Sequence, residues 1–164
     1  RVSRVETGEE MLQAVQETTR TDCPDVVVCA AAVSDFAPVN YSERKRSTAT
    51  GEFELRLKPT PKILGWVRDN LPDSLLVAFK AASSRNDEDL LAAVSPYLEE
   101  DRADIVVGNS VVEDGQGFES VTNRYLVCRK EAEPVVLEKQ SKIRLSVLLW
   151  ESIVADLDRN GPTS

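Results

Sequence analysis

The sequence predicts an α/β domain built on a mostly parallel sheet, and two observations carry that prediction. Three apolar runs have the length of strands: Val26–Ala31, Leu75–Ala81 and Asp104–Asn109. They do not alternate apolar with polar residues, as a strand with one solvent-exposed face would, so we expect them to be buried on both faces. Stretches with helical spacing of apolar residues lie between them, and strand, helix, strand is the order of a parallel crossover. A chain of 164 residues has the length of a single domain.

Composition narrows the classes of function. The net charge of −8 disfavours a nucleic-acid groove, which normally carries a basic stripe. The chain contains no histidine, which excludes Ser-His-Asp and Cys-His nucleophiles and histidine-based metal sites. Chemistry here must rest on carboxylates, lysines and amides. That repertoire suits reactions at phosphates and acyl groups, in which positioning and charge neutralisation dominate.

Two further features bear on the compartment. No apolar run approaches the roughly 18 residues that span a bilayer, and the opening RVSRVETGEE has no signal-peptide core. The cysteines Cys23, Cys29 and Cys128 lack CxxC spacing, so we expect reduced and mostly buried thiols. Together these features predict a cytoplasmic protein.

The first third of the chain reads as strand, helix and strand. Arg1–Glu6 alternates like an edge or entry strand, and Thr7 is placed to cap a helix whose apolar face includes Met11 and Val15. The run Val26–Ala31 then predicts a strand buried on both faces. Three alanines follow its apolar part and leave room beside the backbone at the carboxyl end, where open α/β sheets bind ligands.

Pro38–Gly51 is polar and holds the cation cluster Arg44-Lys45-Arg46, which is the composition of a loop. Phe53–Lys58 alternates apolar and charged residues, which predicts a half-buried strand. Such an excursion in an α/β chain is typical of a protruding arm, and we expect it to serve as a dimer contact or a flap.

The remaining elements follow in regular order. Pro61 is placed to begin a helix, and Asn86 is placed to cap a second one. Two short strands, Asn123–Arg129 and Pro134–Glu138, then predict a hairpin. Ser141 is placed to cap a final apolar helix. If the three parallel strands are neighbours, their small-residue ends line one crevice.

Polar residues at these strand ends have structural and functional interpretations. Asp35 either caps a turn or holds a ribose or base, and Asn109 either forms a turn or reads a base. Lys80, inside an apolar strand, either extends to solvent or meets an anion. Phe118 is either a loop anchor or a stacking platform, and Ser141-Lys142 either caps its helix or binds phosphate.

Seven short stretches, in this order and spacing, resemble one family across nearly the whole chain: phosphopantothenoylcysteine synthetase. They are AAAVSDFAP at Ala30–Pro38, ERK at Glu43–Lys45, PKIL at Pro61–Leu64, AFKA at Ala78–Ala81, VVGNS at Val106–Ser110, GFESVTN at Gly117–Asn123 and SK at Ser141–Lys142. Any one of them alone would be weak, whereas the series is specific.

The resemblance implies a Rossmann-like three-layer α/β domain that forms a homodimer through the protruding segment 41–58. It implies a ligase that uses Mg²⁺ and CTP, or ATP in animals, to convert 4′-phosphopantothenate into an acyl-nucleotide. The amine of cysteine then attacks that intermediate in coenzyme A biosynthesis. FMN would belong only to a fused or associated decarboxylase domain.

By the same resemblance, Lys45 is the catalytic flap lysine that neutralises charge near the α-phosphate, and no residue of this chain is assigned as a metal ligand. The positions that would contact the nucleotide are Ala30, Ala31, Asp35, Phe79, Lys80, Asn109, Phe118 and Lys142.

The chain departs from the family pattern in two places. The family sequence FxAET continues here with Ala82 in place of the glutamate, and no glycine-rich half with an Asn-x-Ser-Ser-Gly segment precedes Arg1. We therefore expect residues 1–164 to be a single α/β domain equivalent to the C-terminal portion of the synthetase, inactive alone. The alternative is a non-catalytic nucleotide-binding or assembly module of the same fold. An unrelated dinucleotide-binding domain is disfavoured because no GxGxxG is present.

Overall fold

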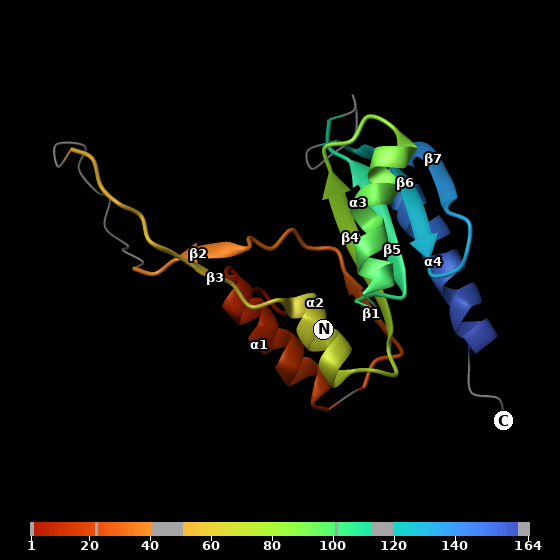
Figure 1. Cartoon of the computed structure of the whole chain (residues 1–164). Coiled ribbons are helices and arrows are strands. Elements are labelled where there is room, and N and C mark those ends of the chain that lie inside the picture. Colours follow the sequence, from red (N-terminus) through yellow and green to blue (C-terminus); the bar gives the residue numbers. More distant parts are fainter. Residues whose placement is uncertain (1, 22, 41–50, 101, 113–119, 161–164) are drawn as a thin grey trace.

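The computed structural model describes residues 2–21, 23–40, 51–100, 102–112 and 120–160 (Figure 1). Within these ranges, four helices accompany a five-stranded sheet and a two-stranded ribbon. In chain order the elements are α1 (Gly8–Thr19), β1 (Val26–Cys29), β2 (Phe36–Pro38), β3 (Leu57–Pro59), α2 (Ile63–Asn70), β4 (Leu75–Ala82), α3 (Asp87–Glu99), β5 (Ile105–Ser110), β6 (Thr122–Arg129), β7 (Val135–Ser141) and α4 (Lys142–Asn160).

The main sheet has the strand order β1-β4-β5-β6-β7. Strands β1, β4 and β5 are parallel, whereas β6 is antiparallel to both of its neighbours, so four of the five strands run in one direction. This confirms the predicted α/β fold with a mostly parallel sheet. Cys29 at the end of β1 lies opposite Ala78, so the second half of β4 continues past the end of β1. A recess therefore opens at this edge of the sheet.

Each face of the sheet has its own hydrophobic core. Side chains alternate along β4, so Leu76 and Ala78 face α2 and α3, whereas Val77 faces α4. In Figure 1 helix α4 lies behind the sheet on the side away from α3. The first core includes Val67, Leu71, Leu76, Leu90, Val94, Val106 and Leu126, and the second includes Val77, Ile105, Val107, Val127, Leu145, Leu149 and Ile153.

Gly108 in β5 lets α3 approach the sheet closely. A Cβ atom at this position would lie 3.0 Å from Cγ1 of Val94 and 3.1 Å from Cγ of Leu90. The small residue near the end of β5 is therefore required by helix packing. We expected the small residues at the end of this strand to line the crevice. The structure shows instead that the glycine contacts α3.

Strand β1 differs from the prediction. We expected a strand at Val26–Ala31 covered on both faces, but β1 ends at Cys29 and lies at the edge of the sheet. Its residues are only partly covered, and Val28 is 43% exposed. The prediction was wrong because an apolar composition does not reveal how many neighbouring strands and helices cover a strand in this chain.

Residues 36–40 and 51–59 form the base and one side of an arm that extends away from the sheet (Figure 1). Its antiparallel ribbon pairs β2 with β3, with Ala37 opposite Lys58. The protrusion was predicted, but the half-buried strand at Phe53–Lys58 was wrong, because only Leu57–Pro59 is a strand and Leu55 and Leu57 are 59% and 51% exposed. The expected entry strand at Arg1–Glu6 is also absent, since residues 2–5 form neither helix nor strand.

The predicted helix caps are confirmed. The side chain of Thr7 accepts a hydrogen bond from the backbone N of Glu10 (3.1 Å), and Asn86 accepts one from Asp89 (2.7 Å). The Ser141 hydroxyl accepts one from the backbone N of Arg144 (3.2 Å), and the β6–β7 hairpin precedes it as expected. These caps satisfy backbone donors that a helix leaves without partners in its first turn.

Candidate functional site

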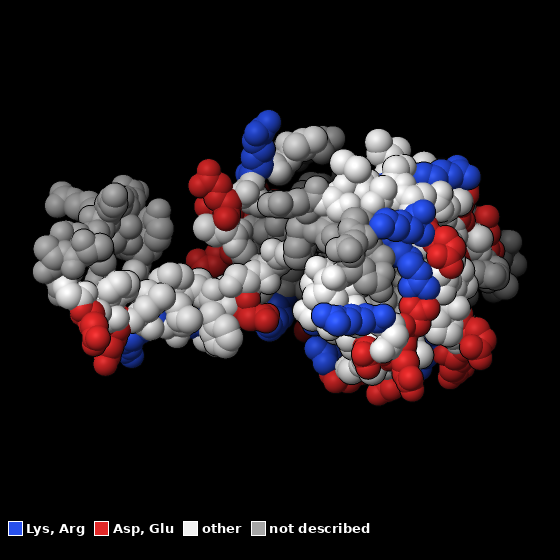
Figure 2. Space-filling view, turned by 90° about the horizontal axis from the view of Figure 1, so that it is seen from above, with Lys and Arg blue, Asp and Glu red and all other residues white. Residues whose placement is uncertain are grey.

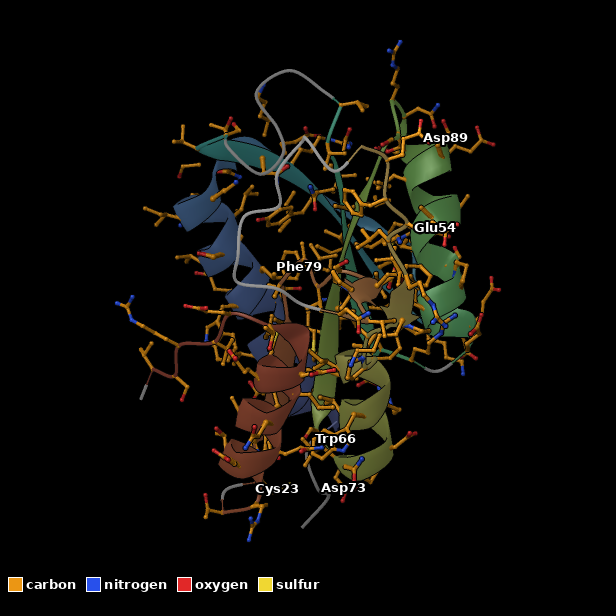
Figure 3. The ribbon with its side chains drawn as sticks, turned by 90° about the vertical axis from the view of Figure 1, so that its left-hand side faces the viewer. Cys23, Glu54, Trp66, Asp73, Phe79 and Asp89 are labelled. Atoms are coloured by element: carbon orange, nitrogen blue, oxygen red, sulfur yellow. The ribbon has the colours of Figure 1, made fainter. Side chains whose placement is uncertain are left out.

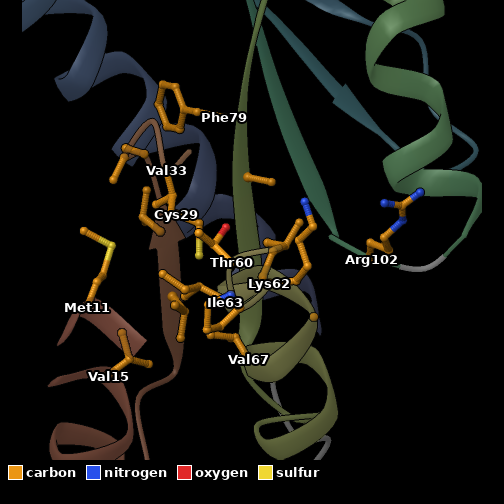
Figure 4. Close-up of a pocket in the computed structure, with 18 of the residues that line it drawn as sticks. Met11, Val15, Cys29, Val33, Thr60, Lys62, Ile63, Val67, Phe79 and Arg102 are labelled. Carbon is orange, nitrogen blue, oxygen red and sulfur yellow. The ribbon is translucent and has the colours of Figure 1, made fainter. Parts of the chain in front are cut away.

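A pocket of about 580 Å³ lies between α1, β1, α2 and the end of α3. Figure 3 shows α1 and α2 side by side below Phe79, and Figure 4 shows the pocket from close by. Met11 and Val15 lie at one end, Arg102 lies at the opposite end, and Lys62 lies between them (Figure 4). The pocket thus has an apolar end and a cationic end. This combination fits a ligand with an apolar ring and a charged group.

The loop after β1, residues 30–35, forms part of the pocket wall. Ala30 and Ala31 line it and are exposed, because β1 ends one residue earlier. The hydroxyl of Ser34 donates to the carbonyl of Phe36 (2.8 Å), which folds the loop back on itself. Thr60 then ties the loop to the segment before α2, since its hydroxyl donates to the carbonyl of Ser34 and its backbone N donates to that of Asp35 (3.0 Å).

Asp35 lies at the rim, and its carboxylate forms an ion pair with Lys62, the residue before α2. The hydrogen bond from Lys62 lowers the pKa of Asp35, and the charges of Lys62 and Lys80 add to the effect. Both partners are largely exposed. Asp35 is therefore an ionised and accessible acceptor at the mouth of the pocket.

A second ion pair fixes the base of the arm. Lys58 of β3 lies 2.8 Å from Glu9 in the first turn of α1. The hydrogen bond from Lys58 lowers the pKa of Glu9. Because α1 carries Met11 and Val15 of the pocket wall, this contact joins the arm to the wall.

Phe79 and Lys80 follow the point where β4 passes the end of β1. Phe79 lines the pocket and packs edge-on against Tyr125, with ring centroids 5.6 Å apart and planes at 87°. Lys80 points to the opposite face, where its Nζ atom lies 5.5 Å from the centre of the Tyr97 ring. This contact with Tyr97 of α3 decides neither of the two interpretations of Lys80, which are extension to solvent and contact with an anion.

The structure brings Ala30, Ala31, Asp35 and Phe79 together in the pocket, with Lys80 beside it. Asn109 and Lys142 do not line it. Asn109 is buried opposite Ala81, and its side chain donates to the carbonyl of Ser110 (3.2 Å). Lys142 begins α4, and its backbone N donates to Val121 (3.0 Å). Lys45 and Phe118 lie outside the described residues.

Sequence reasoning missed several pocket residues. Thr60 and Lys62 flank Pro61, and their place directly before a helix was the one signal that could have found them. Nothing local marks Tyr97 and Arg102, because they reach the pocket only through the packing of α3 on β4.

The described residues place limits on other kinds of site. They contain no group of three or more Cys, Asp or Glu side chains arranged to hold a metal ion. Asp35 is the one carboxylate among the described residues of the pocket wall. No helix within the described ranges has the length and apolar character needed to cross a membrane.

Comparisons with known proteins agree on one family. Residues 1–157 match the model of the DNA/pantothenate metabolism flavoprotein C-terminal domain. The chain is 37% identical over 149 residues to the coenzyme A biosynthesis bifunctional protein CoaBC of Thermococcus kodakarensis, covering 91% of this chain and 36% of the relative. The chain thus spans a little over a third of that relative's length.

Solved structures show the same fold. The DNA/pantothenate metabolism flavoprotein of Streptococcus pneumoniae superimposes with a TM-score of 0.74 at 23% identity, over 93% of this chain and 72% of that one. The C-terminal domain of a CoaBC protein superimposes with a TM-score of 0.69 at 25% identity, over 96% of this chain and 68% of that one.

Proposed function

This chain belongs to the DNA/pantothenate metabolism flavoprotein C-terminal domain family, and we propose that it supplies the nucleotide-binding part of a phosphopantothenate–cysteine ligase of coenzyme A biosynthesis. The observation that carries the proposal is the pocket. Two motifs of the family meet in its wall: one supplies Ala30, Ala31 and Asp35, and the other supplies Phe79. A volume of about 580 Å³ lies within the usual range for small-molecule sites.

In the proposed reaction, a carboxylate oxygen of 4′-phosphopantothenate attacks the α-phosphorus of CTP or ATP, and pyrophosphate leaves. The amine of cysteine then attacks the acyl carbon and releases the nucleoside monophosphate with formation of an amide. Asp35 would accept hydrogen bonds from the ribose hydroxyls, and Lys45 would neutralise charge near the α-phosphate. Alignment and charge neutralisation drive both steps, so a chain without histidine can support them.

Mg²⁺ would neutralise phosphate charge in this reaction. It usually binds through one or two carboxylates together with substrate phosphates, so a wall with one carboxylate fits delivery of the ion on the nucleotide. We propose no residue of this chain as a direct ligand of the ion, because Asp35 pairs with Lys62 and would accept the ribose hydroxyls.

The same proposal covers partners and location. The arm exposes apolar side chains, and Figure 2 shows that much of its visible described surface is uncharged. We propose that segment 41–58 forms a homodimer contact. A flavin-dependent decarboxylase would be fused or associated, as in the bifunctional relatives, and would alone carry FMN. The protein would act in the cytoplasm.

The alternative is a non-catalytic nucleotide-binding or assembly module. Ala82 in place of the family glutamate favours it. Both hypotheses predict a bound nucleotide, whereas only the ligase predicts pyrophosphate release that depends on 4′-phosphopantothenate.

Isothermal titration of the chain with CTP and with ATP, each with Mg²⁺, tests the shared part of the two hypotheses. We expect saturable binding of at least one nucleotide. Absence of binding by a chain whose circular dichroism and cooperative melting show an intact fold would overturn the proposal. Pyrophosphate release with 4′-phosphopantothenate and cysteine present then separates the ligase from the non-catalytic module.

A further inference from the structure

The last helix, α4, carries apolar side chains on two opposite sides. Leu145, Leu149 and Ile153 face the sheet and are buried in its second core. A second set of apolar residues on α4, which we call the outer stripe, is exposed: Ile143 (80%), Val147 (42%), Trp150 (52%) and Val154 (38%). Val147 lies two positions from both Leu145 and Leu149, and two positions advance a helix by slightly more than half a turn. The outer stripe therefore lies on the side of α4 away from the sheet.

The outer stripe has the spacing of a helix-pairing seam. Its members follow one another at intervals of four, three and four positions, so they form one continuous row along α4. In Figure 3 no other helix lies on the outer side of α4. The outward side of a helix in a globular domain normally carries polar residues, and a row of exposed apolar side chains there marks an interaction surface.

Two charged residues flank the outer stripe on one side. Arg144 follows Ile143 and Glu151 follows Trp150, so the two charges are seven positions apart and lie on the same side of the helix. Both are exposed, and neither forms an ion pair with a described residue. The positions three and four away from each, where a partner on the same helix would stand, hold no opposite charge.

We propose that the outer stripe binds the outer stripe of a second copy of this chain, with the two α4 helices antiparallel. One register brings Val147 of each copy opposite Trp150 of the other and Ile143 opposite Val154, so each layer pairs a larger side chain with a valine. In the same register Arg144 of each copy lies beside Glu151 of the other. Two symmetric ion pairs then flank the apolar row.

The charge pattern selects both the occupant and the orientation. In a parallel pair each side chain lies level with its own counterpart, so Arg144 and Glu151 would again lack opposite charges. A twofold contact needs a surface that is complementary to itself, and the reversed order of the two charges on facing antiparallel helices meets that requirement. A partner of one uniform charge would attract only one of the two residues. These observations favour a second copy over an unrelated protein.

The contact is small. Four side chains from each copy bury less than the roughly 1,200 Å² of total surface that a stable interface requires, so isolated chains should associate through α4 only at high concentration. Chains already joined through segment 41–58 would present two outer stripes, and a second contact between the same molecules forms at a raised effective concentration. The α4 contact is therefore expected to assemble arm dimers into larger species. No member of the outer stripe is among the residues proposed to bind the nucleotide.

Sedimentation velocity over a series of protein concentrations tests the contact in the whole chain. Val147→Ser/Trp150→Ser removes the centre of the outer stripe, and Val2→Ser is the control because Val2 is 89% exposed outside every helix. Arg144→Glu, Glu151→Arg and the double reversal Arg144→Glu/Glu151→Arg test the charge pattern. Arg85→Glu, an exposed arginine before α3, is their matched control. Circular dichroism and thermal melts verify that each variant is folded.

We expect the wild type to form species larger than the arm dimer as its concentration rises. Val147→Ser/Trp150→Ser should weaken this association at least about thirtyfold, the effect of removing a central hot-spot residue. Arg144→Glu and Glu151→Arg should each weaken it about tenfold, because each single reversal places like charges together at two symmetric contacts. The double reversal should associate like the wild type, since it restores both ion pairs with their signs exchanged.

Other outcomes overturn the contact. If Val147→Ser/Trp150→Ser associates like the wild type, the outer stripe does not join copies of this chain, and the proposed contact through segment 41–58 keeps its own test. If the single reversals weaken association and the double reversal does not restore it, the antiparallel pairing of Arg144 with Glu151 is wrong. If Val2→Ser or Arg85→Glu weakens association as much as the α4 variants, the effect is not specific to the outer stripe.

Discussion

The ammonium group of Lys62 pairs with the carboxylate of Asp35, so the residue before α2 and the loop after β1 meet at the rim of the pocket. The two residues are 27 positions apart in the sequence. Their contact lowers the pKa of Asp35, whose side chain lines the same pocket as Ala30 and Ala31. A ligand that uses Asp35 must therefore share the carboxylate with Lys62 or displace it.

Asp35→Asn is expected to weaken nucleotide binding about tenfold, because a ribose hydroxyl donates a stronger hydrogen bond to a carboxylate than to an amide oxygen. The melting temperature should not change, since both members of the Asp35–Lys62 pair are largely exposed. Titration calorimetry and a thermal melt measure the two effects. Asp73→Asn, in an exposed turn before β4, is the control. Undiminished binding by Asp35→Asn would show that Asp35 only anchors the loop.

Gly108→Ala is expected to destabilise the fold by about 1–3 kcal/mol, because the added methyl group overpacks the contact with α3. It would meet Val94 at 3.0 Å. Chemical denaturation measures the change. Gly65→Ala in α2 is the matched control, since the nearest atom to its new Cβ lies 3.9 Å away and alanine favours a helix. The double variant Gly108→Ala/Val94→Ala should recover part of the loss from overpacking, and equal effects of the two glycine substitutions would refute the explanation.

Arg129→Met is expected to cost about 3 kcal/mol, because it removes the guanidinium that pairs with the buried carboxylate of Asp156. The pair lies 2.7 Å apart, with side chains 17% and 9% exposed, and the same guanidinium donates to Ser152 (2.5 Å). The free energy of unfolding from denaturant titration reports the loss. Arg129→Met/Asp156→Leu should regain most of it. A double variant as unstable as the single one would mean that packing of the arginine stem dominates.

Leu55→Ser/Leu57→Ser is expected to abolish the proposed homodimer and leave the unfolding of the monomer unchanged, because both side chains are more than half exposed. Sedimentation velocity measures the association state. Val121→Ser, 82% exposed before β6, is the control for removing an exposed apolar side chain elsewhere. A variant that still dimerises would place the interface away from this part of the arm.

Burial raises the pKa of Cys128 to about 11, from 9.0 for an ordinary thiol. The folded state therefore keeps its proton to a higher pH than the unfolded chain, and the free energy of unfolding falls as the pH rises from 9.0 to about 11. Denaturant titrations across this range should give a shallower decline for Cys128→Ala. Cys23→Ala should decline like the wild type, because Cys23 is exposed. Equal slopes for all three proteins would exclude a contribution from Cys128.

Much of the fold followed from local chemistry. The caps at Thr7, Asn86 and Ser141 were predictable, because a side-chain oxygen before a helix satisfies donors only a few residues away. The parallel strands were predictable from apolar runs between helical patterns. The edge position of β1 was not, because the composition of a strand does not report the number of its neighbours.

The candidate site divides in the same way. The α/β class was predictable from the order of apolar runs and helical patterns, and the resemblance to the family pointed to Ala30, Ala31, Asp35 and Phe79. The pairing of Asp35 with Lys62, and the approach of Lys80 and Arg102 to the ring of Tyr97, were not predictable. These contacts depend on how helices pack on a sheet, which no local stretch of sequence encodes. Lys62 precedes α2 and Arg102 follows α3, so the packing of these two helices against the sheet brings both cations to the pocket wall.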